Sequence, residues 1–69
     1  MKTTVKMWAV FNWKGIVLLD TLDSAEYNSQ NRASAYRGYP WWELMKIGYT
    51  CRPVRVTIEE IKNESQRDY

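Results

Sequence analysis

Alternating apolar and polar side chains near the start of the chain predict a β-hairpin. Residues 5–12 alternate at period two, with Val5, Met7, Ala9 and Phe11 on one face and Lys6, Trp8, Val10 and Asn12 on the other. Apolar groups on both faces indicate a central strand, or a strand whose second face meets a partner. Residues 12–15 form a turn in which Gly15 can adopt a positive φ, and a second apolar run covers residues 16–22. Two such runs joined by a glycine-containing turn favour antiparallel pairing.

A helix is predicted within residues 23–37, and two starting points are open. Asp23 or Ser24 can cap an early start, and Ser29 can cap a later one. The weak helix formers of residues 28–31 favour the later start, so we expect a helix from about Ser29 to Arg37. Gly38 is expected to end it as a left-handed C-terminal cap.

A second, short helix is predicted over residues 40–48. Pro40 suits the first helical position, and Gly48 suits the C-terminal cap. One face of this helix is expected to be buried, because its members recur at helical spacing: Trp41, Leu44, Met45 and Gly48. Trp42 lies about 100° away around the helix, at the rim or exposed.

A third strand is predicted from residue 49 to residue 59, where Val54, Val56 and Ile58 alternate with polar residues. Pro53 cannot donate a ladder hydrogen bond, so the strand lies at an edge there or begins after it. The predicted fold is therefore α+β, in the order ββααβ: a three-stranded antiparallel sheet with one helix and a short second helix on one face. Residues 1–58 form a single domain, and residues 59–69 are a polar tail that extends the strand, forms a helical turn or is disordered.

Composition narrows the function classes. The chain has 69 residues, no histidine and one cysteine, so an internal disulfide is impossible and a structural zinc site lacks ligands. Cys51 has no histidine to activate it and is interpreted as a structural residue, while Asp20, Asp23, Glu59 and Glu60 are interpreted as solvated charge. No phosphate-binding loop is present. We expect no enzyme activity, no cofactor and no metal.

The sequence also bears on location. No stretch approaches the roughly 18 apolar residues of a membrane span, and the start of the chain lacks the apolar run of a signal peptide. A single unpaired cysteine fits a reducing compartment. The expected protein is soluble and cytoplasmic.

Surplus aromatic area favours protein binding. One helical layer covers one face of a three-stranded sheet, and Trp8, Val10 and Trp13 are expected on or near the other face. Exposed Trp, Tyr and Arg dominate interface hot spots. A homodimer would cover the same surface. Nucleic-acid binding through the basic and aromatic residues is a second alternative, which the net charge of +2 disfavours.

The order of short motifs resembles small bacteriophage early proteins. The motifs are Trp8-Ala9-Val10, Gly15-Ile16-Val17, Thr21, Arg32-Ala33, Trp41 to Leu44, Gly48-Tyr49 and Val54-Arg55-Val56. The layout is also similar in outline to the phage inhibitor of bacterial RNA polymerase, although that inhibitor has no evident counterpart of Pro40-Trp41-Trp42. The resemblance implies a phage-encoded protein, acting in the host cytoplasm, that binds and blocks a host protein such as RNA polymerase or a defence complex.

These observations give one leading hypothesis for the function. The protein is expected to be a non-enzymatic binder that uses its sheet face and hairpin tip, as a monomer or a homodimer. The predicted partner-binding residues are Trp8, Trp13, Lys14, Arg52 and Arg55, with Trp42 as an anchor at the rim.

Overall fold

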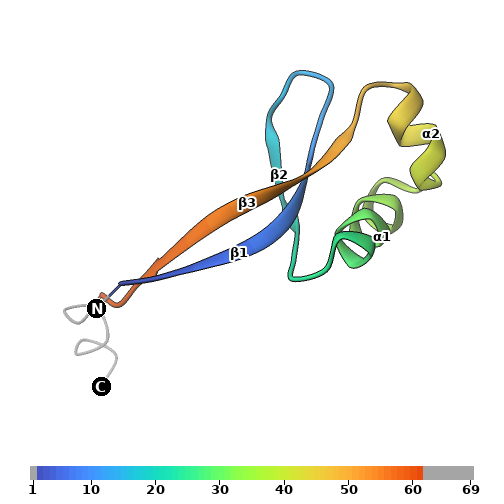
Figure 1. Ribbon diagram of the computed structural model, residues 1–69. Coiled ribbons are helices and arrows are strands. Elements are labelled where there is room, and N and C mark those ends of the chain that lie inside the picture. The colour runs from blue at the N-terminus through green and yellow to red at the C-terminus, as the bar shows by residue number, and fades with distance from the viewer. Residues whose placement is uncertain (1, 62–69) are drawn as a thin grey trace.

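The computed structural model describes residues 2–61 and contains one antiparallel sheet with two helices (Figure 1). Its strands are β1 (Lys2–Phe11), β2 (Val17–Asp23) and β3 (Thr50–Glu59), and its helices are α1 (Glu26–Arg37) and α2 (Trp41–Lys46). The strand order in the sheet is β2-β1-β3, with both pairings antiparallel. The predicted α+β fold and its ββααβ order are confirmed, as are the central position of β1 and the edge position of the strand that contains Pro53.

The hairpin turn follows from the chemistry of Asn12. Its side-chain oxygen accepts hydrogen bonds from the backbone N–H groups of Lys14 at 2.9 Å and Ile16 at 3.0 Å. Gly15 has a φ of 79°, the positive value expected from its place in the turn. The turn therefore forms as the sequence predicts.

Strand β2 contains a bulge that the sequence pattern does not reveal. Val10 is opposite Leu18 but Trp8 is opposite Asp23. Between these two pairs, β2 therefore contains more residues than β1. Thr21 fills the gap in the ladder: its buried hydroxyl accepts the N–H of Val10 at 2.8 Å and donates to the carbonyl of Leu18 at 2.6 Å. The bulge thus leaves no unpaired N–H at Val10, which is fully buried.

Helix α1 starts earlier than the favoured prediction of Ser29. It begins at Glu26 with Ala25 as the N-cap, so neither Asp23 nor Ser24 occupies the capping position. Asp23 still supports this end, because its carboxylate accepts the N–H of Ala25 at 3.1 Å. The other end matches the prediction: Gly38 is the left-handed C-cap with a φ of 77°, and its N–H donates to the carbonyl of Ser34.

Helix α2 differs from the prediction at both ends and on one face. Pro40 is its N-cap rather than its first residue, and Ile47 rather than Gly48 is its C-cap. Leu44 is buried as predicted, whereas Met45 is 51% exposed. Leu44 and Met45 are consecutive, so their side chains project about 100° apart around the helix, and only that of Leu44 is buried.

The core is small and lies where both helices meet the sheet. Its fully buried apolar residues are Val10, Ala33 and Leu44, and the half-buried residues packed against them are Leu18, Trp41, Tyr49 and Cys51. Residues of this cluster come from β1, β2, α1, α2 and β3, so it holds every element in place. Ala9 is buried as well.

The hairpin tip is fastened to the turn between α2 and β3. Trp13 and Tyr49 have ring centroids 5.8 Å apart at an interplanar angle of 55°. Gly48 lies directly beneath Trp13, and a Cβ added to Gly48 would lie 2.9 Å from the Cβ of Trp13. The loop that follows α2 and the hairpin loop therefore touch, although they are far apart in the sequence.

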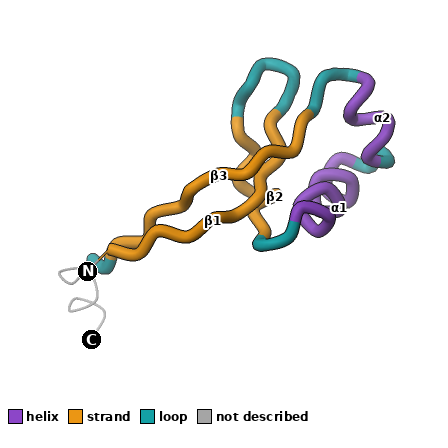
Figure 2. The backbone as a smooth tube through the Cα atoms, in the orientation of Figure 1, coloured by secondary structure: helices purple, strands orange, loops and turns teal. Residues whose placement is uncertain are grey.

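Half of β1 extends beyond β2 and pairs only with β3. Pairs with β2 involve Trp8, Val10 and Phe11, whereas the pairs with β3 continue to Lys2 and Glu59. The result is a two-stranded arm, formed by residues 2–7 and 54–59, that projects away from the helices (Figure 2). Glu59 belongs to this arm rather than to the predicted tail, and the remainder of the tail beyond Ile61 lies outside the described residues.

Candidate protein-binding surface

Each strand presents one face to the helices and one to solvent, and the register identifies both. Val10 and Cys51 are cross-strand partners that pack with the helices, so the face they share is covered. By alternation, the opposite face carries Val5, Met7, Ala9 and Phe11 of β1 and Arg52, Val54, Val56 and Ile58 of β3. We call this second surface, together with Val17, Leu19 and Leu22 of β2, the open face.

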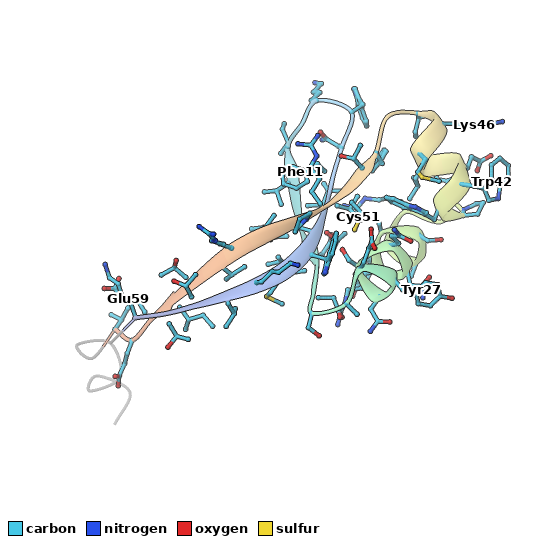
Figure 3. All side chains as sticks on the ribbon, viewed as in Figure 1. Phe11, Tyr27, Trp42, Lys46, Cys51 and Glu59 are labelled. Carbon is cyan, nitrogen blue, oxygen red and sulfur yellow. The ribbon has the colours of Figure 1, made fainter. Side chains whose placement is uncertain are left out.

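A shallow groove of about 390 Å³ runs across the open face. Its apolar lining comes from all three strands: Phe11, Val17, Leu19, Leu22, Val54 and Val56. Leu19 is 71% exposed and Val17 is also exposed, which is unusual for aliphatic side chains gathered on one surface of a sheet. Figure 3 shows Phe11 on the sheet, well away from α2.

A basic side chain borders this groove. The guanidinium carbon of Arg52 lies 4.7 Å from the centroid of the Phe11 ring, a cation–π arrangement. Arg52 also donates from Nε to the hydroxyl of Thr50 at 3.1 Å, which fixes the direction of its long side chain. The open face is therefore apolar in the middle and positively charged where Arg52 covers Phe11.

The expected places of Trp8 and Val10 are wrong. Both lie on the covered face, because Val10 belongs to the core and Trp8 precedes it by two residues on the same regular strand. Trp8 is half-buried, and the ammonium group of Lys6 lies 5.3 Å from its ring centroid. The sequence pattern shows apolar residues on both faces of β1. The face that carries the bulky Trp8 was predicted to lie away from the helices, and it lies toward them. The helices instead cover the face that carries Val10, and on the other face Val5, Met7 and Phe11 are half-buried while Ala9 is buried.

The other predicted partner-binding residues are dispersed over the molecule. Trp13 and Lys14 are exposed at the hairpin tip, and Arg52 is on the open face. Arg55 lies on the opposite side of β3 from Arg52, because odd positions share the face of Cys51. Trp42 is exposed on α2, where Lys46 lies 5.3 Å from its ring centroid (Figure 3). Of the predicted residues, Arg55 contributes to the lining of the groove and Arg52 borders it through its contact with Phe11, whereas Phe11, Leu19 and Val54 were not singled out.

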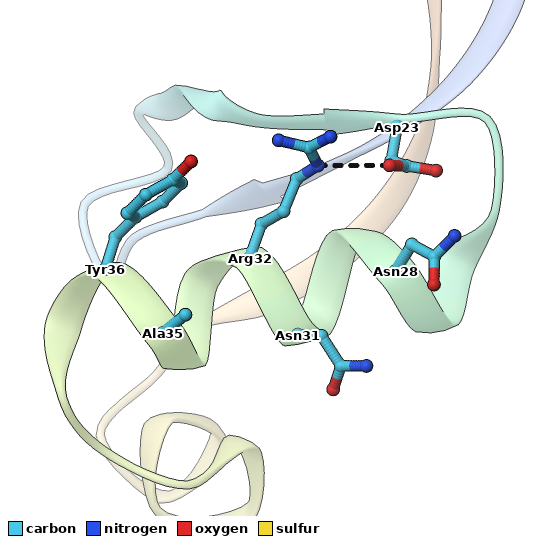
Figure 4. A pocket seen from close by; sticks show the side chains of 6 residues that line it. All are labelled: Asp23, Asn28, Asn31, Arg32, Ala35 and Tyr36. Carbon is cyan, nitrogen blue, oxygen red and sulfur yellow. Dashed lines mark hydrogen bonds and ion pairs between the residues drawn. The ribbon is translucent and has the colours of Figure 1, made fainter.

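A second hollow, of about 380 Å³, lies between β2 and α1, and its polar groups serve the fold (Figure 4). Arg32 donates from Nε to the carboxylate of Asp23 at 3.0 Å, and Asp23 also accepts the N–H of Ala25. The hydrogen bond from Ala25, followed by that from Arg32, lowers the pKa of Asp23, and the bond to Asp23 raises the pKa of Arg32. The pair fastens the start of α1 to the end of β2.

Cys51 is placed as a structural residue. It is half-buried on the covered face, and its Sγ lies 3.9 Å from the carbonyl oxygen of Glu26. Burial, the largest cause, raises the pKa of the thiol above its ordinary value. A raised pKa disfavours the thiolate, which is the nucleophilic form. Residues 2–61 contain no group of three or more cysteine or acidic residues arranged to hold a metal ion.

Comparisons of the chain with protein-family models, with curated proteins and with solved structures gave no match. Among residues 2–61, the longest helix falls short of the length and apolar character needed to cross a bilayer. The geometry of the open face is therefore the basis for a functional proposal.

Proposed function

We propose that this chain is a non-enzymatic binding protein that holds a partner protein against its open face. The observation that supports this proposal is the apolar groove formed by all three strands, with Leu19 71% exposed at its side. Contiguous apolar surface of this kind on a soluble chain usually marks a contact. The fully buried core cluster consists of three residues, Val10, Ala33 and Leu44. Contact with a partner at the open face would therefore add substantially to the apolar burial that stabilises the fold.

The charge around the groove indicates what kind of partner fits. Arg52 places a guanidinium over Phe11, and carboxylates are its preferred counterpart in an interface. The partner surface is therefore apolar with acidic residues at its border. The resemblance to phage early proteins makes the proposal more specific: the partner is a host protein in the bacterial cytoplasm, such as RNA polymerase or a defence complex, and binding occludes it.

A pair of matched variants tests the open face. Leu19→Glu places a carboxylate in the groove, and Tyr27→Glu places one on α1, where the side chain is equally exposed at 72%. We expect Leu19→Glu to weaken binding by at least about tenfold, because a buried and unpaired charge costs several kcal/mol. Tyr27→Glu should bind like the wild type. Thermal unfolding of both variants checks that the fold is retained.

The measurement begins with capture from a bacterial lysate and ends with the captured protein in pure form. Titration of that purified protein with the wild type and the two variants gives the dissociation constants. Equal affinity for the Leu19→Glu and wild-type chains would contradict the open face as the binding surface. Capture of nucleic acid instead, with an affinity that falls steeply with salt, would support the nucleic-acid alternative.

A further inference from the structure

Among residues 2–61, no strand pairs with the outer edge of β3 along the arm, and the hydrogen bond at Val10 shows which residues direct their backbone groups toward it. The N–H of Val10 points toward β2, since it donates to Thr21. N–H groups alternate in direction along a strand, so even-numbered residues of β1 point away from β3. Their partners on β3 are odd-numbered, because Val10 is opposite Cys51 and Lys6 is opposite Arg55. Arg55, Thr57 and Glu59 therefore direct their N–H and C=O groups outward.

Pro53 supports this assignment independently. It is opposite Trp8 and belongs to the same odd-numbered set, so its missing N–H faces the outer edge and costs the sheet no ladder hydrogen bond. Pro53 also limits where a further strand can add. Beyond it, toward the end of the arm, no other strand among residues 2–61 pairs with the edge from Arg55 to Glu59.

This edge is complementary to itself. If a second copy runs antiparallel and Thr57 is opposite Thr57, then Arg55 of each copy is opposite Glu59 of the other. All three of these pairs are of the hydrogen-bonded kind, because the residues involved are those that direct their backbone groups outward. We infer that two copies of this chain associate through the outer edges of their β3 strands, in the register centred on Thr57. The interface is isologous, with each contact present twice.

The second copy would also offset the repulsion between two like charges in the arm, those of Lys6 and Arg55. Lys6 and Arg55 are directly opposite each other on β1 and β3, and among the described residues neither takes part in an ion pair. Like charges in this position are destabilising. Glu59 of the second copy would lie beside Arg55, and the existing pair of Lys2 and Glu59 at 3.9 Å would gain Arg55 of the second copy as a neighbour. Each carboxylate would then lie between two cations.

Association would also join the open faces of the two copies into one continuous surface. Val56 and Ile58 point to that face, and in the proposed register Val56 of one copy is opposite Ile58 of the other. Ile58 is exposed in the single chain. The two arms would become a four-stranded sheet in place of two isolated two-stranded ribbons, which are only marginally stable by themselves. The helices do not obstruct this arrangement, since they lie at the opposite end of the molecule from the tip of the arm (Figure 1).

The outer edge of β1 is less suited to self-association than the outer edge of β3. It is also free along residues 2–6, but two copies paired there about Thr4 would place Lys2 opposite Lys6 twice. The cost of like-charge pairs disfavours that arrangement. Within the arm, self-association is therefore expected at the edge of β3 rather than at that of β1.

The test is the state of association of the full chain, measured by sedimentation equilibrium over a wide range of protein concentration. We expect a reversible monomer–dimer equilibrium that weakens with added salt, because its ion pairs are exposed. Thr57→Pro removes an outward N–H and should weaken association by at least about tenfold through the two hydrogen bonds lost. Thr4→Pro is the matched control, since Thr4 is opposite Thr57 in the arm and also directs its N–H outward, toward the other side. It should leave association unchanged.

Charge exchange provides a second test that does not depend on proline. Glu59→Arg should weaken association roughly threefold to tenfold, as expected for two exposed ion pairs, and the double variant Arg55→Glu/Glu59→Arg should restore it. A chain that remains monomeric at all concentrations would overturn the inference. So would equal effects of Thr4→Pro and Thr57→Pro, or a double variant no better than Glu59→Arg. None of these results bears on partner binding at the open face, which the Leu19→Glu variant tests separately.

Discussion

At the residue scale, Thr21 shows how one side chain determines the course of a strand. Its hydroxyl occupies the position of a ladder partner for Val10 and at the same time donates to Leu18. Serine, threonine, asparagine and aspartate commonly form such local bonds to the backbone in competition with regular structure. Because the bulge depends on one hydroxyl, the alternation of apolar residues in β2 gave no sign of it.

We predict that Thr21→Val destabilises the protein by about 1–3 kcal/mol, since it leaves the buried N–H of Val10 without a partner. The two side chains have similar shapes, so a change in packing volume contributes little. Chemical denaturation measures the loss. Thr3→Val, at an exposed position in the arm, is the control and should change stability by no more than about 0.5 kcal/mol. Equal stabilities for the two variants would show that the hydroxyl does not support the bulge.

At the element scale, a positive-φ glycine lies at the C-terminal end of each helix, Gly38 as the C-cap of α1 and Gly48 just after Ile47, the C-cap of α2, but their surroundings differ. Gly38 has a φ of 77° with open space around its Cα, whereas Gly48 has a φ of 104° and lies against Trp13. The first needs only a left-handed backbone. The second needs both that backbone and the absence of a side chain, because the hairpin tip rests on it. The sequence identified both as helix-ending glycines, and nothing local to Gly48 indicated the distant contact.

The two glycines should therefore respond differently to alanine. Gly38→Ala is expected to cost about 1–2 kcal/mol, the usual strain of a left-handed residue with a Cβ. Gly48→Ala should cost more, since its Cβ would lie 2.9 Å from the Cβ of Trp13 and 3.3 Å from its Cα. Equilibrium unfolding gives both values. The Trp13–Tyr49 contact should also loosen in Gly48→Ala alone, which near-ultraviolet circular dichroism detects; an unchanged aromatic signal would contradict this account.

The element boundaries show what a sequence pattern can determine. Gly15, Gly38 and Pro53 were placed correctly because each acts through its own backbone geometry. The predicted start of α1 and the predicted burial of Met45 were wrong, because both depend on which residues of other elements lie nearby. The choice between the two faces of β1 was wrong for the same reason, since both faces are apolar and only the position of the helices distinguishes them. The fold was thus predicted correctly, whereas of the predicted partner-binding residues only Arg52 and Arg55 lie at the groove.

At the scale of the whole molecule, stability rests on very few buried residues. Leu44 is 1% exposed and is the largest fully buried side chain, and the remaining core is made of smaller groups. A single core in a chain this short rarely supplies more than about 3–5 kcal/mol. Every contact that removes the open face from water thus has a large relative effect on the folded population.

We predict that Leu44→Ala leaves the isolated chain largely unfolded at room temperature, because such a substitution costs about 2–5 kcal/mol. The neighbouring Met45→Ala is the control, since Met45 is 51% exposed and should lose less than about 1 kcal/mol. Far-ultraviolet circular dichroism as a function of denaturant measures both. A cooperative Leu44→Ala transition close to that of the wild type would mean that the core is not concentrated where the structure places it.

The two lysines at the outer edge of β1 have a consequence for solubility. A sheet that adds identical copies at both edges grows into a fibre, and exposed edges of this kind are a common origin of aggregation. In the proposed dimer the outer edge of β2 and the arm of β1 would stay unpaired among residues 2–61, and Lys2 and Lys6 lie on that edge of the arm. Repulsion between these lysines would oppose the addition of further copies along the arm of the proposed dimer. Replacing both lysines with glutamine should therefore favour association beyond the proposed dimer.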